Sequence, residues 1–237
     1  FVTRRGSRLL LGDRPFYFVG ANMLFTTDSA HREPPLGRER AARTLDALRD
    51  AGVSVVRVWC FNEDAPRIDA PRPDVENNAT AAASPYARLS YDPAQIAALD
   101  WVVWAAKMRG LRLILTLSNF WTPYKRPEEH LFPRPPSEDE DSAPERSDAA
   151  AEDARRAGSD VRSLYGGGVS SDGGRATAAL KRHAYALITR ANPLTGLKYG
   201  EDPAVMAWAL LNEPRCPACF GPGEQRAHWL WLADVAA

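Results

Sequence analysis

Apolar runs of strand length alternate with amphipathic stretches of helical length along most of this chain. The spacing predicts strands over Val53–Trp59, Leu111 to about Ser118 and Val205–Leu211. It predicts helices over residues 38–51, 92–110, 175–191 and 224–235. Strands that are apolar on both faces and alternate with amphipathic helices indicate a parallel sheet in an α/β fold.

The N-terminal residues add a hairpin and a first strand to this repeat. Between Arg8 and Asn22, the apolar runs LLL and PFYFV flank Gly12-Asp13, which predicts a hairpin that leads into a strand ending at Gly20-Ala21-Asn22. Gly52 is expected to be the C-cap of the first long helix. Asp92 and Pro93 are expected to be the N-cap and first-turn residue of the second.

Two segments interrupt the repeat, and both leave from the C-terminal end of a predicted strand. Residues 122–174 contain PRPPSEDEDSAPE and runs of glycine, with too few large apolar side chains to offset the entropy of ordering them. They predict a long, mostly mobile surface insertion, and residues 64–84 are a shorter loop of the same character. In a (β/α)₈ barrel, the loops at the C-terminal ends of the strands carry the active site.

Polar and aromatic side chains gather at these same strand ends. They are Asn22, Arg57, Trp59, Asn62, Asn119, Trp121, Asn212 and Glu213. In a barrel these positions converge on one mouth. Aromatic faces stack on sugar rings, amides bind hydroxyl groups, and a carboxyl group can protonate a glycosidic oxygen. Taken singly, each residue also fits a loop hydrogen bond or a helix cap.

The segments that carry these residues resemble family 5 glycoside hydrolases, and among them the endo-β-1,4-mannanases of plants and fungi. The matching segments, in order, are FVTRRGSRLLLGDRPFYFVGAN, VVRVWCFNE, LDWVVWAAKMRGLRLILTLSNFW, RHAYALITRANPLTGLKYGEDPAVMAW and MAWALLNEPRCPAC. The resemblance implies a (β/α)₈ barrel, with about its first four β/α units and an N-terminal hairpin present here. Residues 1–237 would form part of one catalytic domain, with residues 122–174 inserted in it.

The resemblance also implies roles for single residues. Glu213 matches the general acid/base of the family, and Asn212 matches the residue that binds the sugar 2-hydroxyl. Arg57 matches the arginine that orients the nucleophilic carboxylate, and Trp59 matches an aromatic substrate contact. Asn22, Asn119 and Trp121 complete the expected substrate-binding set.

Two segments differ from the family pattern. The chain has Asn119-Phe120 where relatives have two asparagines, and it has Met-Leu-Phe after Asn22 where relatives have Tyr-Trp.

A retaining glycosidase needs two carboxylates about 5 Å apart, one of them a nucleophile. In the family the nucleophilic glutamate follows the seventh strand, at a position beyond Ala237, and neither Glu63 nor Asp64 is expected to replace it. We therefore expect the chain to have little or no hydrolase activity alone. Two other readings stay open. One is a β-1,4-glucanase or glucomannanase, and the other is a non-catalytic carbohydrate-binding protein that retains part of the barrel.

The cysteines give a weaker signal. Cys60 ends an apolar run and is expected to be a small buried side chain. Cys216 and Cys219 form a CPAC pair that fits a metal half-site, a redox pair or a short disulfide. Of these the disulfide is preferred, and the resemblance implies it as well, because fungal relatives have a short disulfide there.

Charge and composition limit the partners. The chain has 30 basic and 30 acidic residues, so no net charge attracts it to nucleic acid or to an anionic membrane. No apolar run approaches the roughly 20 residues that span a bilayer, and the N-terminal sequence lacks the order of a signal peptide. The resemblance implies a secreted enzyme of cell-wall polysaccharides, β-mannan or glucomannan. We expect it to be monomeric at full length, to use no metal or organic cofactor, and to have a signal peptide outside this chain.

Overall fold

A computed structural model describes residues 1–32, 35–60, 67–68, 89–90, 93–119, 173–214 and 233. The chain divides into two compact units. Unit 1 comprises Phe1–Pro66, Ser90–Ser118 and Ala184–Asn212, and unit 2 comprises Arg67–Leu89, Asn119–His183 and Glu213–Ala237. Most of the predicted insertion, the predicted helix at 224–235 apart from residue 233, and the CPAC pair lie outside the described residues.

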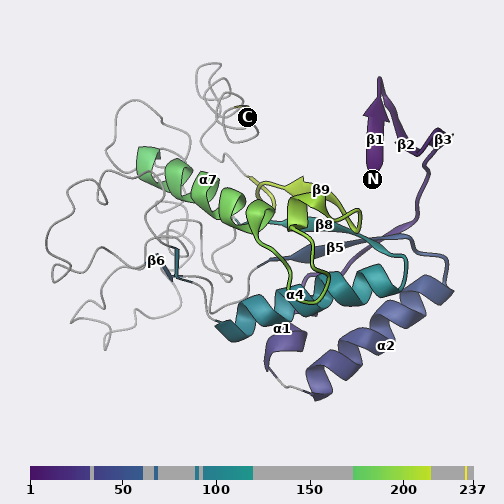
Figure 1. The fold of residues 1–237 in the computed structure, drawn as a ribbon, viewed down its shortest axis with the longest axis horizontal. Coiled ribbons are helices and arrows are strands. Elements are labelled where there is room, and N and C mark those ends of the chain that lie inside the picture. The colour runs from purple at the N-terminus through teal and green to yellow at the C-terminus, as the bar shows by residue number, and fades with distance from the viewer. Residues whose placement is uncertain are drawn as a thin grey trace, which may run out of the picture. The chain divides into compact units, whose positions relative to one another are not determined.

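Unit 1 contains a parallel sheet of four strands: β4 (Gly20–Asn22), β5 (Val55–Trp59), β8 (Arg112–Thr116) and β9 (Val205–Ala209). The strands lie side by side in chain order, β4-β5-β8-β9 (Figure 1). The predicted strands at β5, β8 and β9 are confirmed, each shorter than its apolar run. A register shift between Leu113 and Ile114 on β8 leaves Met206 of β9 without a paired residue. Consecutive parallel strands joined by helices are the arrangement expected of successive β/α units.

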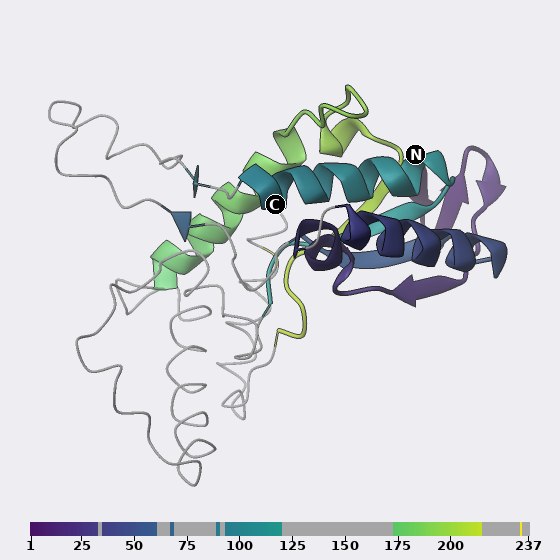
Figure 2. The same ribbon diagram turned by 90° about the horizontal axis from the view of Figure 1, so that it is seen from below.

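The two faces of this sheet differ in burial. Val56, Val58, Leu113 and Leu115 point to one face and are all fully buried. Helices α1 (Thr26–Arg32), α2 (Leu36–Asp50) and α4 (Pro93–Met108) cover that face (Figures 1 and 2). On the other face Arg57 and Ile114 are half-buried, and they belong to one row of paired residues that lies across it from strand to strand. This row consists of Asn22, Arg57, Ile114 and Ala207.

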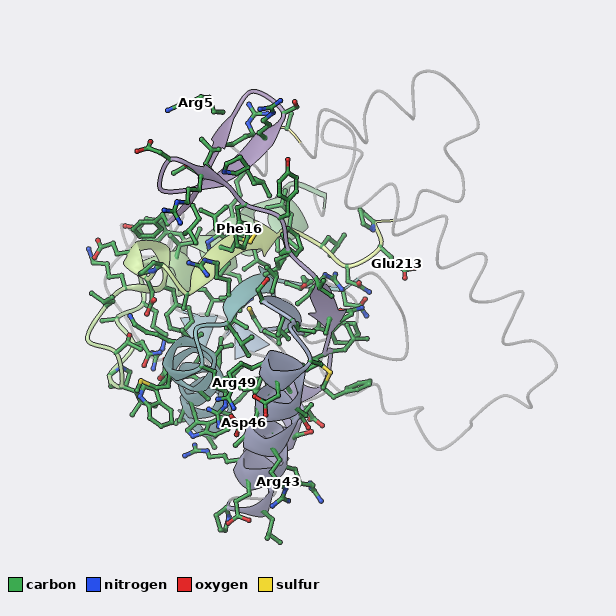
Figure 3. All side chains as sticks on the ribbon, turned by 90° about the vertical axis from the view of Figure 1, so that its right-hand side faces the viewer. Arg5, Phe16, Arg43, Asp46, Arg49 and Glu213 are labelled. Atoms are coloured by element: carbon green, nitrogen blue, oxygen red, sulfur yellow. The ribbon has the colours of Figure 1, made fainter. Side chains whose placement is uncertain are left out.

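The helices pack on each other as well as on the sheet. The α4 residues Leu99, Val102 and Val103 are completely buried, so this helix forms much of the core. At the helix ends, Asp46 of α2 accepts hydrogen bonds from Arg109 Nε and Nη2, at 3.0 and 2.9 Å. Figure 3 shows Asp46 on α2. The hydrogen bond from Arg109 lowers the pKa of the Asp46 carboxyl.

Glycines terminate two of these helices in the same way. Gly52 has φ +83°, its N–H donates to the Arg49 carbonyl, and the Val53 N–H donates to the Leu48 carbonyl. This pair of bonds is a Schellman motif, which requires a left-handed residue just after the C-cap. Gly110, with φ +70°, ends α4 with the equivalent bonds. The expectation that Gly52 is itself the C-cap was wrong by one residue, because Ala51 holds that position.

The N-terminal region differs from its prediction in three ways. The hairpin at Gly12-Asp13 is confirmed between β2 (Arg8–Leu11) and β3 (Arg14–Pro15), and an unpredicted strand, β1 (Val2–Arg5), pairs with β2. The predicted strand over PFYFV is confirmed only at Pro15, which belongs to β3 and pairs with Leu10, whereas pairing with β5 involves Gly20–Asn22. The Val19 carbonyl accepts hydrogen bonds from the N–H groups of Ser54 and of Val55, the first residue of β5, so backbone bonding to β5 begins at residue 19. The short helix α1 was not predicted.

A buried polar cluster attaches the approach to β9 to helix α4. The third predicted helix is α7 (Gly173–Thr189), and after it comes the single turn η2 (Tyr199–Glu201). Asp100 of α4 accepts hydrogen bonds from Arg190 and from the Tyr199 hydroxyl. Nearer β9, Lys107 of α4 pairs with Asp202 at 3.0 Å. The segment that leads into β9 is therefore fixed at two points along one helix.

In unit 2 the structure describes little beyond the first part of α7 and β6. Strand β6 (Arg67–Ile68), within the predicted loop at 64–84, forms a two-stranded sheet with β7 (Leu89–Ser90). Among the residues described, no helix has the length and apolar character to cross a membrane.

Candidate active site

Arg57 lies at the centre of the polar group that the sequence singled out. It is on β5, on the sheet face away from the helices, and its Cα pairs with that of Asn22 on β4. Its Nη1 donates to Asn22 Oδ1 at 3.2 Å, and its Nη2 donates to Asn212 Oδ1 at 2.8 Å. The structure therefore brings together three predicted site residues, two from neighbouring N-terminal strands and one from the segment after β9.

Asn212 is held by its backbone as well as its side chain. Its N–H donates to the Ser118 carbonyl at 2.8 Å, which continues the pairing of β9 with β8 beyond the ends of both strands. The residue is 9% exposed. A buried amide needs a partner, and the bond to a charged guanidinium is of the stronger kind. This contact therefore fixes the direction in which the chain leaves β9.

Glu213 follows Asn212 directly and has an unusual backbone conformation. Its φ is +47°, and it is the one non-glycine residue with positive φ in the described part of the chain. A side chain in this region costs roughly 1 kcal/mol or more, and such residues gather at functional sites. Glu213 is exposed, and Figure 3 shows its side chain on the loop that follows β9. The predicted acid/base thus lies in the first turn after a barrel-type strand.

Trp59 is the last residue of β5 and is 3% exposed. Its ring meets that of Phe25 edge-on, with the centroids 6.0 Å apart and an interplanar angle of 65°. Its carbonyl accepts a hydrogen bond from Thr27 Oγ1 at 2.8 Å. The predicted contact of Trp59 with substrate stays a prediction, and in the structure this indole packs against the protein.

The remaining predicted residues are only partly described. Asn119 is fully buried and follows Ser118, whose carbonyl accepts the Asn212 N–H. Trp121, Asn62, Glu63 and Asp64 lie outside the described residues. Asn119 and Glu213 belong to unit 2, whereas Asn22, Arg57 and Asn212 belong to unit 1.

Cys60 follows Trp59, and burial raises the pKa of its thiol. The predicted small buried side chain is confirmed, since the residue is buried and has no disulfide. A thiol with a raised pKa stays protonated and is a poor nucleophile or metal ligand at neutral pH. Within the described ranges, no group of three or more His, Cys, Asp and Glu side chains is arranged to hold a metal ion.

Sequence reasoning missed the contacts of Phe25 and Thr27 with Trp59. Thr27 has no exposed surface, and its bond to the Trp59 carbonyl joins residues 32 positions apart. The run TTDS at residues 26–29 carries only the local signal of a helix start, and α1 does begin at Thr26. Nothing in a single sequence marks the tertiary partner of such a hydroxyl.

Curated relatives match this chain along its whole length. It is 30% identical to the putative mannan endo-1,4-beta-mannosidase 5 of Oryza sativa subsp. japonica, with 99% of this chain and 39% of the rice protein covered. It is 29% identical to mannan endo-1,4-beta-mannosidase 7 of the same species, with 100% and 50% covered. The chain thus spans about half or less of the length of these relatives.

Solved structures match the fold. The endo-1,4-beta-mannanase of Rhizomucor miehei gives a TM-score of 0.62 at 19% identity, over 100% of this chain and 56% of that one. The endo-1,4-beta-D-mannanase of Thermotoga petrophila gives a TM-score of 0.55 at 21% identity, over 93% and 51%. The fold of this chain is therefore part of a (β/α)₈ barrel, to which the described residues contribute the strands β4, β5, β8 and β9.

The N-terminal half of the chain, which holds several residues of the candidate site, matches a known protein family. Residues 1–125 match the family described as GH family 5 beta-mannosidase-like. This range contains β4, β5, α4 and β8, and with them Asn22, Arg57, Trp59 and Asn119. The chain belongs to the β-mannosidase-like group of glycoside hydrolase family 5.

Proposed function

We propose that this chain carries the acid/base half of a retaining glycoside hydrolase that cleaves internal β-1,4-mannosidic bonds in mannan-type polysaccharides. The observation that carries the proposal is the hydrogen bond from Arg57 to Asn212, the residue directly before Glu213. This bond fixes the Asn212 amide and the Arg57 guanidinium relative to each other. Family membership and the names of the rice and fungal relatives supply the substrate class.

In this proposal Glu213 protonates the leaving oxygen in the first step and then removes a proton from the attacking water. Such a group needs to reach solvent and substrate, which agrees with its exposed position after β9. Asn212 binds the 2-hydroxyl of the sugar at the cleaved bond. A hydrogen bond at that hydroxyl strengthens as the oxocarbenium-like transition state forms.

Arg57 acts on the nucleophilic carboxylate rather than on the sugar. A guanidinium held on two of its nitrogens is a fixed positive charge, and a preorganised charge stabilises an anion without reorganising. In the family the nucleophile is a second glutamate, which must lie about 5 Å from the acid/base for retention. Retention therefore requires a second carboxylate held at that distance from Glu213.

The enzyme is proposed to be secreted and to act as a monomer. A polysaccharide of the cell wall is too large to cross a membrane, so the enzyme has to reach it outside the cell. Neither a metal ion nor an organic cofactor takes part in the proposed steps, because two carboxyl groups suffice for retaining hydrolysis.

The test uses the natural gene product that contains residues 1–237, with initial rates measured on mannan, glucomannan and carboxymethylcellulose. We expect the highest kcat/KM on mannan, and we expect Glu213→Gln to lower kcat by about a hundredfold to ten-thousandfold. Glu201→Gln is the matched control, because Glu201 is an exposed glutamate that pairs with Lys198. It is expected to leave the rate unchanged.

A second substrate separates loss of the acid from loss of the fold. The 2,4-dinitrophenyl β-mannobioside has a leaving group that needs no protonation, so Glu213→Gln is expected to keep a burst of dinitrophenol release. Equal rates of wild type and Glu213→Gln on mannan would contradict the assigned role. Higher kcat/KM on carboxymethylcellulose would favour a glucanase, and binding of mannan without hydrolysis would favour a carbohydrate-binding protein.

A further inference from the structure

Residues 22–27, which run from the last residue of β4 into the start of α1, contact both of the β5 residues predicted to serve the active site. Asn22 Oδ1 accepts the hydrogen bond from Arg57 Nη1, and the Met23 N–H donates to the Arg57 carbonyl at 2.8 Å. Two residues further on, Phe25 meets the Trp59 ring, and the Thr27 hydroxyl donates to the Trp59 carbonyl.

From these four contacts we infer that residues 22–27 are a positioning element for Arg57 and Trp59, with Asn22 and Thr27 as its positioning residues. The inference rests on the proposed function for its effect on the reaction. It assigns Asn22, which the sequence placed among the substrate contacts, to the support of Arg57 instead. The reaction would then depend on a segment in which this chain, with Met-Leu-Phe after Asn22, departs from the family pattern.

Asn22 acts on the orientation of the Arg57 guanidinium. A planar guanidinium held at Nη2 alone can still tilt about that bond, whereas bonds at both Nη1 and Nη2 fix its plane. The two acceptors lie on either side of Arg57, one on β4 and one just after β9. Loss of the Asn22 oxygen therefore removes the hydrogen bond at Nη1, while the bond from Nη2 to Asn212 stays in place.

Thr27 acts on the end of β5. The Trp59 carbonyl is bound on one side by the Thr27 hydroxyl, while the next residue, Cys60, donates its N–H to the Thr116 carbonyl at 2.9 Å. Thr27 and Trp59 are both buried, so water cannot replace the hydroxyl when it is removed. Phe25 then limits the rotation of the indole through its edge contact.

Substitutions of Asn22 and of Thr27 are expected to have different kinetic effects in the natural gene product. We expect Asn22→Leu, which is similar in size but has no acceptor, to lower kcat on mannan about tenfold to a hundredfold, with KM within about threefold. Asn22→Asp keeps an acceptor oxygen and is expected to restore most of kcat. Thr27→Val removes the hydroxyl at constant shape and is expected to raise KM, because it loosens the end of β5, where the sequence predicts that Trp59 contacts the substrate. Thr44→Val is the matched control, since the Thr44 hydroxyl bonds only within the exposed surface of α2.

A spectroscopic readout tests the inference without any activity. Rotation of the Arg57 guanidinium about its Nε–Cζ bond is measured by nitrogen-15 and carbon-13 NMR, with the signal assigned through Arg57→Lys. Slow rotation is expected in wild type and Asn22→Asp, and faster rotation in Asn22→Leu. Equal rotation rates in wild type and Asn22→Leu would overturn the inference. If rotation changes as expected but no β-1,4 polymer is cleaved, the positioning role stands and the proposed function fails.

Discussion

Asp100 on α4 accepts two hydrogen bonds from Arg190, at 2.9 Å from Nε to Oδ1 and at 2.5 Å from Nη2 to Oδ2. The Tyr199 hydroxyl donates to the same Oδ1 at 2.7 Å, and Asn192 Nδ2 donates to the Asp100 backbone carbonyl at 2.9 Å. The hydrogen bond to Asp100 raises the pKa of Arg190 further above its usual value. One buried carboxylate thus organises the whole turn between α7 and β9, the strand that leads to Asn212.

Replacement of Arg190 by methionine is expected to lower the free energy of unfolding by about 3 kcal/mol, because it leaves a buried carboxylate without its cation. The Asp100 side chain is 3% exposed, so water cannot take the place of the guanidinium. Urea denaturation of the purified chain, followed by circular dichroism, measures the change. Arg49→Met is the control, since its pairs with Asp46 and Asp50 are both exposed and are each expected to contribute under about 1 kcal/mol. Equal decreases in the free energy of unfolding in the two variants would show that the Asp100 cluster stabilises the fold no more than an exposed ion pair does.

The parallel sheet could be predicted because its strands are buried and locally recognisable. Val55–Trp59 and Arg112–Thr116 are apolar on most positions, and glycines mark the ends of the helices before them. For the strand Gly20–Asn22, the sequence predicted the correct end at Asn22 but placed the start too early, in the aromatic run PFYFV. The aromatic run before it suggests pairing, yet Tyr17 is 86% exposed because the chain has not yet reached β5.

The candidate site was recognised from strand ends, but its contacts were not. A strand end predicts that Asn22, Arg57 and Asn212 share a rim, since parallel strands align their carboxyl ends. It does not predict that the guanidinium bonds both amides, because that depends on residues up to 155 positions apart. The Asp100 cluster was missed for the same reason, since its charged partner Arg190 is 90 positions away.

Gly37, near the start of α2, is expected to tolerate no side chain. A Cβ there would overlap the carbonyl oxygen of Ser29, a backbone atom of α1 that cannot rotate away. Gly37→Ala is therefore expected to push α1 and α2 apart and to lower the free energy of unfolding by about 3 kcal/mol or more. Gly52→Ala is the matched control: its Cβ meets open space, and only the positive φ opposes it, at a cost of about 1 kcal/mol. Thermal unfolding of both variants compares the two effects, and a Gly37→Ala protein as stable as Gly52→Ala would show that the two helices separate easily.

Cys60 is expected to make the free energy of unfolding fall as the pH becomes alkaline. Burial raises the pKa of its thiol in the folded state, while the unfolded thiol ionises near its ordinary value of about 8.5. The contribution of a group whose folded pKa is raised is fully present below the unfolded pKa and is lost as the pH rises above it. The stability advantage of wild type over Cys60→Ala is therefore expected to fall by about 1.4 kcal/mol between pH 7.5 and pH 9.5.

The comparison with Cys60→Ala isolates this thiol, because every other titrating group is common to both proteins. One such group is Tyr199, whose pKa is raised by burial and by the nearby Asp100 carboxylate, and which lowers the stability of both proteins above about pH 10. Urea denaturation under reducing conditions at the two pH values gives the difference directly. An advantage that stays constant would mean that the Cys60 thiol ionises as readily in the folded chain as in the unfolded one. That result would be incompatible with the burial of Cys60, which is 4% exposed directly after β5 and donates its N–H to the Thr116 carbonyl.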